Sequence, residues 1–352
     1  MRPTEDLNVK SLTPIIAPED LKQVFPAPKG AFELVDASRR EIVEALYGRT
    51  DGVVALVGPC SIHDPVACMD YARRLAGLAE EVKETLLVVM RVYFEKPRTT
   101  VGWKGLVNDP DLDGSNRISK GLGIARRLLC EITELGLPIG TETLSPINPQ
   151  YLADLISWGG IGARTSQSQT HREMVSGLSF PVGIKNPTSG GLAIALDAME
   201  SAREAHSFLG ISHEGRSAIV ETSGNRNVHL VLRGFDSGPN YDSANVREAS
   251  EMLAKRGLPG GVMVDCSHGN SRKKHNLQEA ALEDVMRQIS GGEKAIFGFM
   301  LESFINEGSQ KLGGKLKYGV SITDACMDWP TTERLIRGAH KTLSACGRKR
   351  KK

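Results

Sequence analysis

VVALVGPCSIH (residues 53–63) begins as a short apolar run rich in β-branched residues and ends in a polar loop. Seven further runs of this kind follow, separated by stretches with helical periodicity. Near-continuous apolar runs of this length predict strands that are buried on both faces, and therefore a parallel sheet. The eight predicted strands are 53–57, 86–93, 137–141, 161–165, 182–185, 228–233, 262–266 and 295–301.

The alternation of strands and helices indicates the fold class. The helix candidates are 65–80, 117–135, 150–157, 192–207, 243–255, 276–289 and 331–343. Eight such units fit an α/β fold of the (β/α)8 TIM barrel type better than an open sheet. We interpret residues 1–45 as an N-terminal extension and residues 208–227 as an inserted β-hairpin. No linker separates these parts, so we expect a single domain over 1–352, with the barrel at 46–346 and a basic tail at 347–352.

The composition excludes several classes of protein. Hydrophobic residues make up 40% and the net charge is +2, but five positive charges lie in residues 348–352, which leaves −3 on the rest. A charge confined to one end does not predict a nucleic-acid surface, so we expect a solvated tail. No apolar run is long enough to span a membrane, and residues 1–12 are too polar for a secretory signal. Six scattered cysteines predict reduced thiols in a cytoplasmic setting.

Basic residues gather at the carboxyl ends of the predicted strands, where this fold carries its active sites. Side by side, these cations would repel one another without an anionic ligand. Arginine pairs bidentately with phosphate and carboxylate groups, and lysine adds a point charge. The sequence therefore predicts a site for a phosphorylated carboxylic acid, although any single residue of the set could serve a structural ion pair. The residues are Arg91, Lys96, Arg98, Arg164, Lys185 and Arg233.

The same strand ends offer a mixed set of metal ligands. Cys60, His268, Glu302 and Asp324 supply a thiolate, an imidazole and two carboxylates. Such a set suits a borderline divalent ion such as Mn²⁺, Fe²⁺, Co²⁺ or Zn²⁺. Sequence spacing cannot decide whether these residues bind a metal ion, because each comes from a different strand–helix unit. Cys60 could be a buried core residue, and three other histidines are alternatives to His268. These are His63, His171 and His275.

At these residues the sequence closely resembles the class I 3-deoxy-D-arabino-heptulosonate 7-phosphate (DAHP) synthases. The resemblance rests on GPCSIHDP (58–65), MRVYFEKPRTTVGWKGL (90–106), GARTSQSQTHRE (162–173), VGIKN (182–186), DCSHGNS (265–271), LESFINEG (301–308) and YGVSITDAC (318–326). It implies condensation of phosphoenolpyruvate with D-erythrose 4-phosphate and water, giving DAHP and phosphate for the shikimate pathway. Two alternatives are 3-deoxy-D-manno-octulosonate 8-phosphate synthase and a catalytically silent amino-acid sensor.

The resemblance also implies roles for individual residues. The metal ligands are the four named above, and phosphoenolpyruvate contacts Ala163 and Glu142 together with five of the cations, Arg91, Lys96, Arg164, Lys185 and Arg233. Erythrose 4-phosphate contacts Lys96, Pro97, Arg98 and Thr99. Lys96 is the candidate proton donor to the new hydroxyl group. The group that activates water stays open among His268, Glu142 and a water on the metal.

Relatives of this branch are feedback-regulated, and they are commonly dimers or tetramers. The matching regulatory positions here are Asp6, Pro149, Ser179, Phe208 and Gly210. Phe208 can stack on an aromatic ring. Glycine at 210, where phenylalanine-sensitive relatives have serine, leaves room for one more hydroxyl group, which favours tyrosine as the inhibitor. Tryptophan stays open, and Gly210 could instead merely serve a turn.

Overall fold

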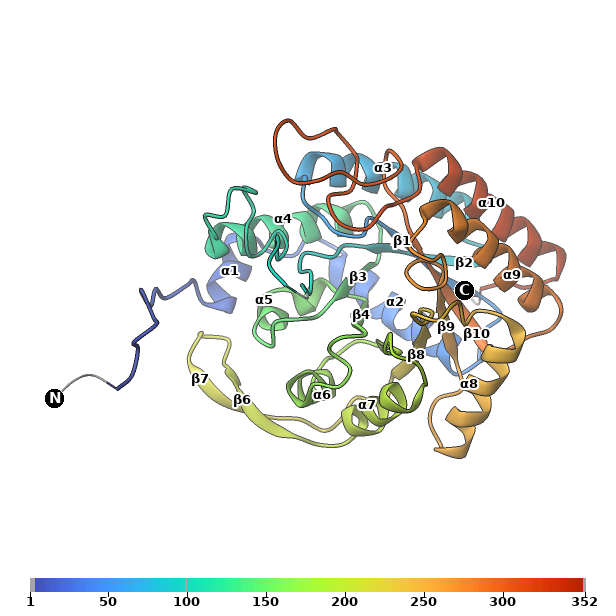
Figure 1. The fold of residues 1–352 in the computed structure, drawn as a ribbon, viewed down its shortest axis with the longest axis horizontal. Helices are drawn as coiled ribbons and strands as arrows, with labels where there is room; N and C mark the ends of the chain where they lie inside the picture. Colours follow the sequence, from blue (N-terminus) through green and yellow to red (C-terminus); the bar gives the residue numbers. More distant parts are fainter. Residues whose placement is uncertain (1–3, 99, 351–352) are drawn as a thin grey trace.

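Eight parallel strands close into a barrel in the computed structural model, which describes residues 4–98 and 100–350 (Figure 1). Their order around the barrel is β1-β10-β9-β8-β5-β4-β3-β2, so β1 and β10 close the ring. The strands are β1 Val53–Gly58, β2 Leu86–Arg91, β3 Ile139–Glu142, β4 Trp158–Ile161, β5 Val182–Lys185, β8 Val228–Leu232, β9 Val262–Asp265 and β10 Ile296–Glu302. The predicted barrel is confirmed.

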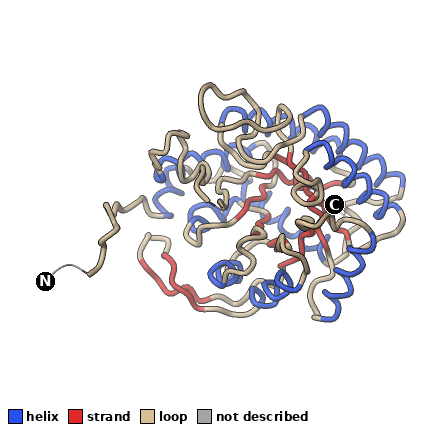
Figure 2. The backbone as a smooth tube through the Cα atoms, viewed as in Figure 1, coloured by secondary structure: helices blue, strands red, loops and turns tan. Residues whose placement is uncertain are grey.

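Helices cover the outside of the strands (Figures 1 and 2). They are α3 Pro65–Val82, α4 Ile118–Glu134, α5 Asn148–Leu152, α6 Gln169–Ser176, α7 Ala193–Arg203, α8 Ser243–Lys255, α9 Gln278–Ser290 and α10 Trp329–Ala345, with short 3-10 turns at Ala153–Leu155 and His275–Leu277. Aspartate side chains fix three helix starts. Asp64, Asp242 and Asp328 accept hydrogen bonds from free backbone N–H groups in the first turns of α3, α8 and α10.

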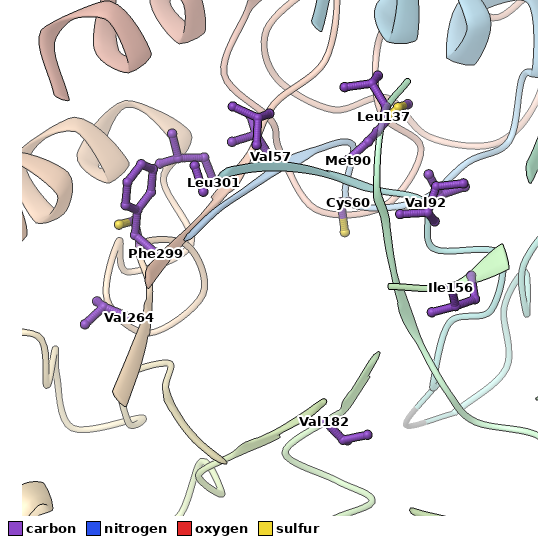
Figure 3. Close-up of a cluster of buried hydrophobic side chains, with 14 of the residues drawn as sticks. Val57, Cys60, Met90, Val92, Leu137, Ile156, Val182, Val264, Phe299 and Leu301 are labelled. Carbon is purple, nitrogen blue, oxygen red and sulfur yellow. The ribbon is translucent and has the colours of Figure 1, made fainter. Parts of the chain in front are cut away.

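Two layers of apolar side chains form the core. Successive residues of a strand face opposite sides, and six of the eight strands contribute apolar side chains to both layers; β3 and β5 are the exceptions. Val57, Val264 and Leu301 belong to the layer between strands and helices, part of which is drawn in Figure 3. Val54, Val89 and other inward-facing residues fill the barrel interior. The barrel is therefore a packed core and not a pore.

The N-terminal extension contains two helices that the sequence analysis did not propose, α1 Pro18–Val24 and α2 Ala31–Leu46. Ile42, Ala45 and Leu46 of α2 pack with the interior residues of the barrel, including Val54 at the start of β1. This contact closes the amino-terminal end of the barrel. The extension is thus part of the barrel core at α2.

The inserted hairpin consists of β6 Ser207–Ile211 and β7 Ser217–Glu221, which pair antiparallel outside the barrel. It lies apart from the barrel strands, as Figure 1 shows. The predicted hairpin is confirmed. The helix predicted over 192–207 is shorter than expected, because α7 ends at Arg203 and Ser207 already begins β6.

The fourth barrel strand lies earlier than predicted. It covers Trp158–Ile161, so the predicted strand 161–165 is wrong in position. Gly159 and Gly160 concealed it, because glycine has a low strand propensity. The barrel needs glycine here: a Cβ atom on Gly160 would lie 2.7 Å from the ring of Trp158. Arg164 consequently lies in the loop after β4 and not at the strand end.

The structure records no membrane-spanning candidate and no disulfide in the part of the chain that it describes. None of the described helices is both long and apolar enough to cross a membrane. All six cysteines are free thiols.

The basic tail is not simply solvated, contrary to expectation. Arg350 forms an ion pair with Glu41 of α2, with Nη2 2.6 Å from Oε2. Its Nη1 also donates to the carbonyl oxygens of Lys83 and Leu86, at 3.0 and 3.1 Å. Arg348 donates to the carbonyl oxygen of Glu293. The tail therefore ties the last helix to α2 and to the turn before β2.

Replacing Arg350 with alanine should lower the free energy of unfolding by about 1–2 kcal/mol, because charge-assisted hydrogen bonds between partly buried groups contribute about that much. Denaturant unfolding of Arg350→Ala and of Lys349→Ala, an exposed neighbour, provides the measurement and its control. Identical midpoints for both variants and the wild type would show that the tail contacts contribute nothing. Activity should be unchanged in both.

Candidate active site

A cavity of about 470 Å³ opens at the carboxyl ends of the barrel strands. All six cations singled out in the sequence line it: Arg91, Lys96, Arg98, Arg164, Lys185 and Arg233. Pro97, Glu142, Ala163, His268, Glu302 and Asp324 line it as well. Thr99 lies outside the described residues.

Strand geometry explains why several of these charges converge. Residues two apart in a strand face the same side. The inward-facing apolar residues near the strand ends are Val89, Val231, Met263 and Met300. The charged residues two positions later are Arg91, Arg233, Asp265 and Glu302. They form the last inward-facing layer of the barrel, and Arg91, Arg233 and Glu302 of this layer line the cavity.

Two buried ion pairs hold this layer. Arg91 Nη2 lies 3.0 Å from Glu302 Oε1, and these side chains are 0% and 2% exposed. Lys185 Nζ lies 2.9 Å from Asp265 Oδ2. Burial acts to raise the pKa of Asp265, but Lys185 and His268 outweigh it and hold that pKa well below its usual value. The aspartate is therefore ionised across the neutral pH range, and each pair joins two different strands.

Three predicted metal ligands lie together. Ligand atoms of Cys60, Glu302 and Asp324 are all within 4.8 Å of one another. His268 stands beside this group, with Nε2 3.7 Å from Glu302 Oε1. Its Nδ1 lies 3.0 Å from Asp265 Oδ2, a contact that fixes the ring and leaves Nε2 toward the cluster. Burial and the Glu302 carboxylate raise the pKa of the Cys60 thiol, while Lys96 lowers it.

Lys96 connects the ligand cluster to the substrate cavity. Its Nζ is 3.2 Å from both the sulfur and the carbonyl oxygen of Cys60. Burial acts to lower the pKa of Lys96, but the negative charges of Cys60, Glu142 and Glu302 outweigh it and raise the pKa. The ammonium group is thus held charged between Cys60 of the ligand cluster and the cavity.

The competing histidines lie elsewhere. His63 packs edge-on against Phe304, and His171 of α6 forms a hydrogen bond with Ser168, the residue before that helix. His275 contacts Glu307 at 3.2 Å. None of the three is among the residues described as lining the cavity.

Three residues near the cations were given no role by the sequence analysis. Tyr93 presents its ring 4.1 Å from the guanidinium carbon of Arg91. The period-two pattern 89, 91, 93 could have revealed it. Asp265 lies at a strand end that the motif DCSHGNS already marked. No sequence pattern indicated Glu95, because its role depends on tertiary contacts. Burial raises its pKa to about 7, and its carboxylate accepts a hydrogen bond from the Ser145 amide of another loop.

The five predicted regulatory positions are spread over several elements. Pro149 of α5 lines a second, small cavity that also contacts Glu142. Phe208 and Gly210 lie two apart on one face of β6, opposite Val220 and Ala218 of β7. Gly210 therefore belongs to a regular strand and not to a turn. Asp6 is exposed in the extension, and Ser179 is exposed before β5.

Comparison with known proteins agrees with this geometry. Residues 30–337 match the model of the DAHP synthetase I family. The chain is 52% identical to the Phe-sensitive phospho-2-dehydro-3-deoxyheptonate aldolase of Escherichia coli K12, over 97% of this chain and 98% of that one. It is 50% identical to the Tyr-sensitive enzyme of the same strain, over 94% and 93%. The solved phospho-2-dehydro-3-deoxyheptonate aldolase of Francisella tularensis superposes with a TM-score of 0.94 at 46% identity, covering 96% of this chain and 99% of that one. The chain therefore belongs to the DAHP synthetase I family.

Proposed function

We propose that this chain condenses phosphoenolpyruvate with D-erythrose 4-phosphate and water to give DAHP and phosphate. The observation that carries the proposal is a cavity lined by six cations and by Glu302 and Asp324, whose carboxylates lie within 4.8 Å of the buried thiol of Cys60. The cations suit a phosphorylated carboxylate, and the cluster of thiol and carboxylates suits a divalent ion. Family membership and relatives of about 50% identity support the same activity.

Arg91, Lys96, Arg164, Lys185 and Arg233 are proposed to bind phosphoenolpyruvate, with Ala163 beside it. Arg98, Pro97 and Thr99 are proposed to bind the aldose phosphate. Arg91 and Lys185 are already paired with carboxylates, so their positions are preorganised before the ligand arrives. A preorganised cationic site stabilises the anions that develop during the reaction without the cost of reorienting solvent.

Cys60, His268, Glu302 and Asp324 are proposed to hold a divalent metal ion. The donor set fits, because two carboxylates and a buried thiol converge within 4.8 Å and His268 stands beside them. Binding a cation would also offset the burial that disfavours the thiolate of Cys60. The ion would supply Lewis acidity toward the aldehyde oxygen of the sugar phosphate. Mn²⁺, Fe²⁺, Co²⁺ and Zn²⁺ all suit these ligands.

The residues of the chain account for the proton transfers. C3 of phosphoenolpyruvate forms a bond with the aldehyde carbon, and Lys96 donates a proton to the resulting alkoxide. Water adds to C2, and the bond between C2 and the phosphate oxygen breaks to leave a ketone and inorganic phosphate. Glu142 and His268 both line the cavity, and either can accept the proton that water releases.

We further propose feedback inhibition by tyrosine at a site that includes Asp6, Pro149, Ser179, Phe208 and Gly210. Relatives of this chain are named Phe-sensitive and Tyr-sensitive, so an aromatic effector is expected. The missing side chain at 210, beside Phe208 on the same strand face, supports the larger ligand. A homodimer or homotetramer is also proposed, since the hairpin exposes Leu209 and Ile219 by 84% and 72%.

The direct test of the activity measures phosphate release from phosphoenolpyruvate with each of two aldose phosphates. We expect turnover with erythrose 4-phosphate and little with arabinose 5-phosphate. A chelator should abolish the activity, and added Mn²⁺ should restore it. Release with arabinose 5-phosphate alone would assign the octulosonate reaction, and no release with either sugar would indicate a silent sensor.

Substitution of the ligands tests the metal assignment. Cys60→Ala and His268→Ala should each reduce metal-dependent kcat by about 100-fold or more, because even an outer-shell change costs about 10- to 100-fold. Bound metal, measured by elemental analysis, should fall in parallel. Cys346→Ala, which removes an exposed thiol, serves as the control. Full turnover of either ligand variant in metal-stripped buffer would contradict the assignment.

Inhibition by the three aromatic amino acids tests the regulatory proposal. Tyrosine should inhibit the wild type most strongly, and Gly210→Ser should shift the preference toward phenylalanine because the new side chain occupies the space for the hydroxyl group. A Cβ atom at 210 would lie 2.7 Å from Val220 Cγ2, so the variant also requires a thermal unfolding measurement. Ser207→Ala, on the opposite face of β6, is the control. Absence of tyrosine inhibition at millimolar concentration would contradict the proposal.

A further inference from the structure

The loop after β9 has an unusual backbone. Six non-glycine residues of the described chain have a positive φ, and three of them lie here: His268 at 55°, Arg272 at 51° and Lys273 at 60°. Arginine and lysine have no short polar side chain that could stabilise this left-handed conformation locally. Such residues persist only where the surrounding structure holds them, often where a loop clamps a ligand.

Contacts to the β8 loop hold this segment in place. Asn270 Nδ2 donates to the carbonyl oxygens of Leu232 and Asp265, at 3.1 and 2.8 Å, and its Oδ1 accepts from the Asn240 amide. The Gly269 amide donates to the carbonyl oxygen of Arg233 at 3.0 Å. The loop is therefore fixed against the segment that carries Arg233.

Lys273, near the end of this loop, lies at the cavity. Its backbone N–H donates to the carbonyl oxygen of His268 at 2.8 Å, and the residue is among those that line the cavity, as are Arg233 and Arg164. Lys273 is exposed, which places it at the rim. The next residue, Lys274, is exposed too but is not among the cavity's lining residues.

Arg164, Arg233 and Lys273 differ from Arg91 and Lys185 in their ion pairing. Arg91 and Lys185 are neutralised by Glu302 and Asp265. Within the described ranges 4–98 and 100–350, no ion pair involves the side chain of Arg164, Arg233 or Lys273. Asp265, Asp236 and Glu302 act on Arg233 only from beyond ion-pair distance. Arg164, Arg233 and Lys273 line one cavity without an ion-pair partner, and such cations suit a group with two negative charges, of which phosphate is one.

We infer that Lys273 binds the phosphate group of the enol phosphate substrate, completing at the rim the site that Arg164 and Arg233 form deeper in the cavity. The inference rests on the proposed function, since it names a further residue for that substrate. The strained backbone of residues 272–273 directs the ammonium group to this position. Lys273 is a substrate-binding residue in this scheme and takes no part in proton transfer.

The test compares Lys273→Ala, Lys273→Arg and Lys273→Gly with the control Lys274→Ala. In Lys273→Ala, KM for phosphoenolpyruvate should rise about 5- to 20-fold, while kcat and KM for erythrose 4-phosphate stay within about twofold. Lys273→Arg should recover most of the loss. Lys273→Gly should bind as weakly as the alanine variant, yet melt about 1–3 °C above the wild type, because glycine adopts a positive φ without strain.

Calorimetric binding of phosphoenolpyruvate to the metal-loaded protein, without the second substrate, separates this inference from the proposed activity. The dissociation constant should rise in Lys273→Ala and not in Lys274→Ala. Equal constants for the two variants would overturn the inference, as would a rise confined to KM for erythrose 4-phosphate. A wild type that binds phosphoenolpyruvate without turnover would contradict the proposed activity and leave the binding comparison intact.

Discussion

The pairing of Arg91 with Glu302 and of Lys185 with Asp265 is the constraint on which the site depends. Four charges inside a barrel would be costly if any stood alone, and breaking one buried pair by removing a partner typically costs about 3–5 kcal/mol. Each pair joins two strands that are distant in the chain: β2 to β10, and β5 to β9. The pairs therefore fix the relative positions of the strand ends from which the other functional groups extend.

This arrangement places two kinds of cation in one cavity. The paired cations keep their positions without a ligand, whereas Arg164, Arg233 and the rim residue Lys273 form no ion pair in the described part of the chain and are available to a bound anion. Electrostatic preorganisation of this type strengthens the binding of charge that develops during a reaction, because the groups need not move. The ligand cluster adjoins the same layer through Glu302, which both pairs with Arg91 and belongs to the carboxylate–thiol group.

The N-terminal extension and the hairpin β6–β7 differ in how they pack against the barrel. Helix α2 packs into the amino-terminal end of the barrel and belongs to its core, and Arg350 anchors the chain's other end to it. The hairpin β6–β7 instead pairs only with itself and presents exposed apolar side chains such as Leu209. It therefore contributes no strand to the closed barrel and is separate from the layer of charges at the strand ends.

The sequence alone was sufficient for the barrel, the hairpin and the identity of the charged residues at the strand ends. These features depend on local periodicity, since apolar runs define strands and the position after each run defines the cavity-facing loop. It misplaced β4, because glycine has a low strand propensity. Gly159 and Gly160 are required by tertiary contacts, with the ring of Phe180 against Gly159 and the ring of Trp158 against Gly160.

Only the tertiary structure decided which charges pair, that His268 stands beside the ligand cluster while His63 and His275 do not, and that Arg350 contacts α2. It alone also revealed the left-handed backbone that brings Lys273, and not Lys274, to the cavity. These facts depend on the register between strands far apart in the chain and on loop conformation. Periodicity within one segment cannot encode either, because both are set by the closure of the barrel.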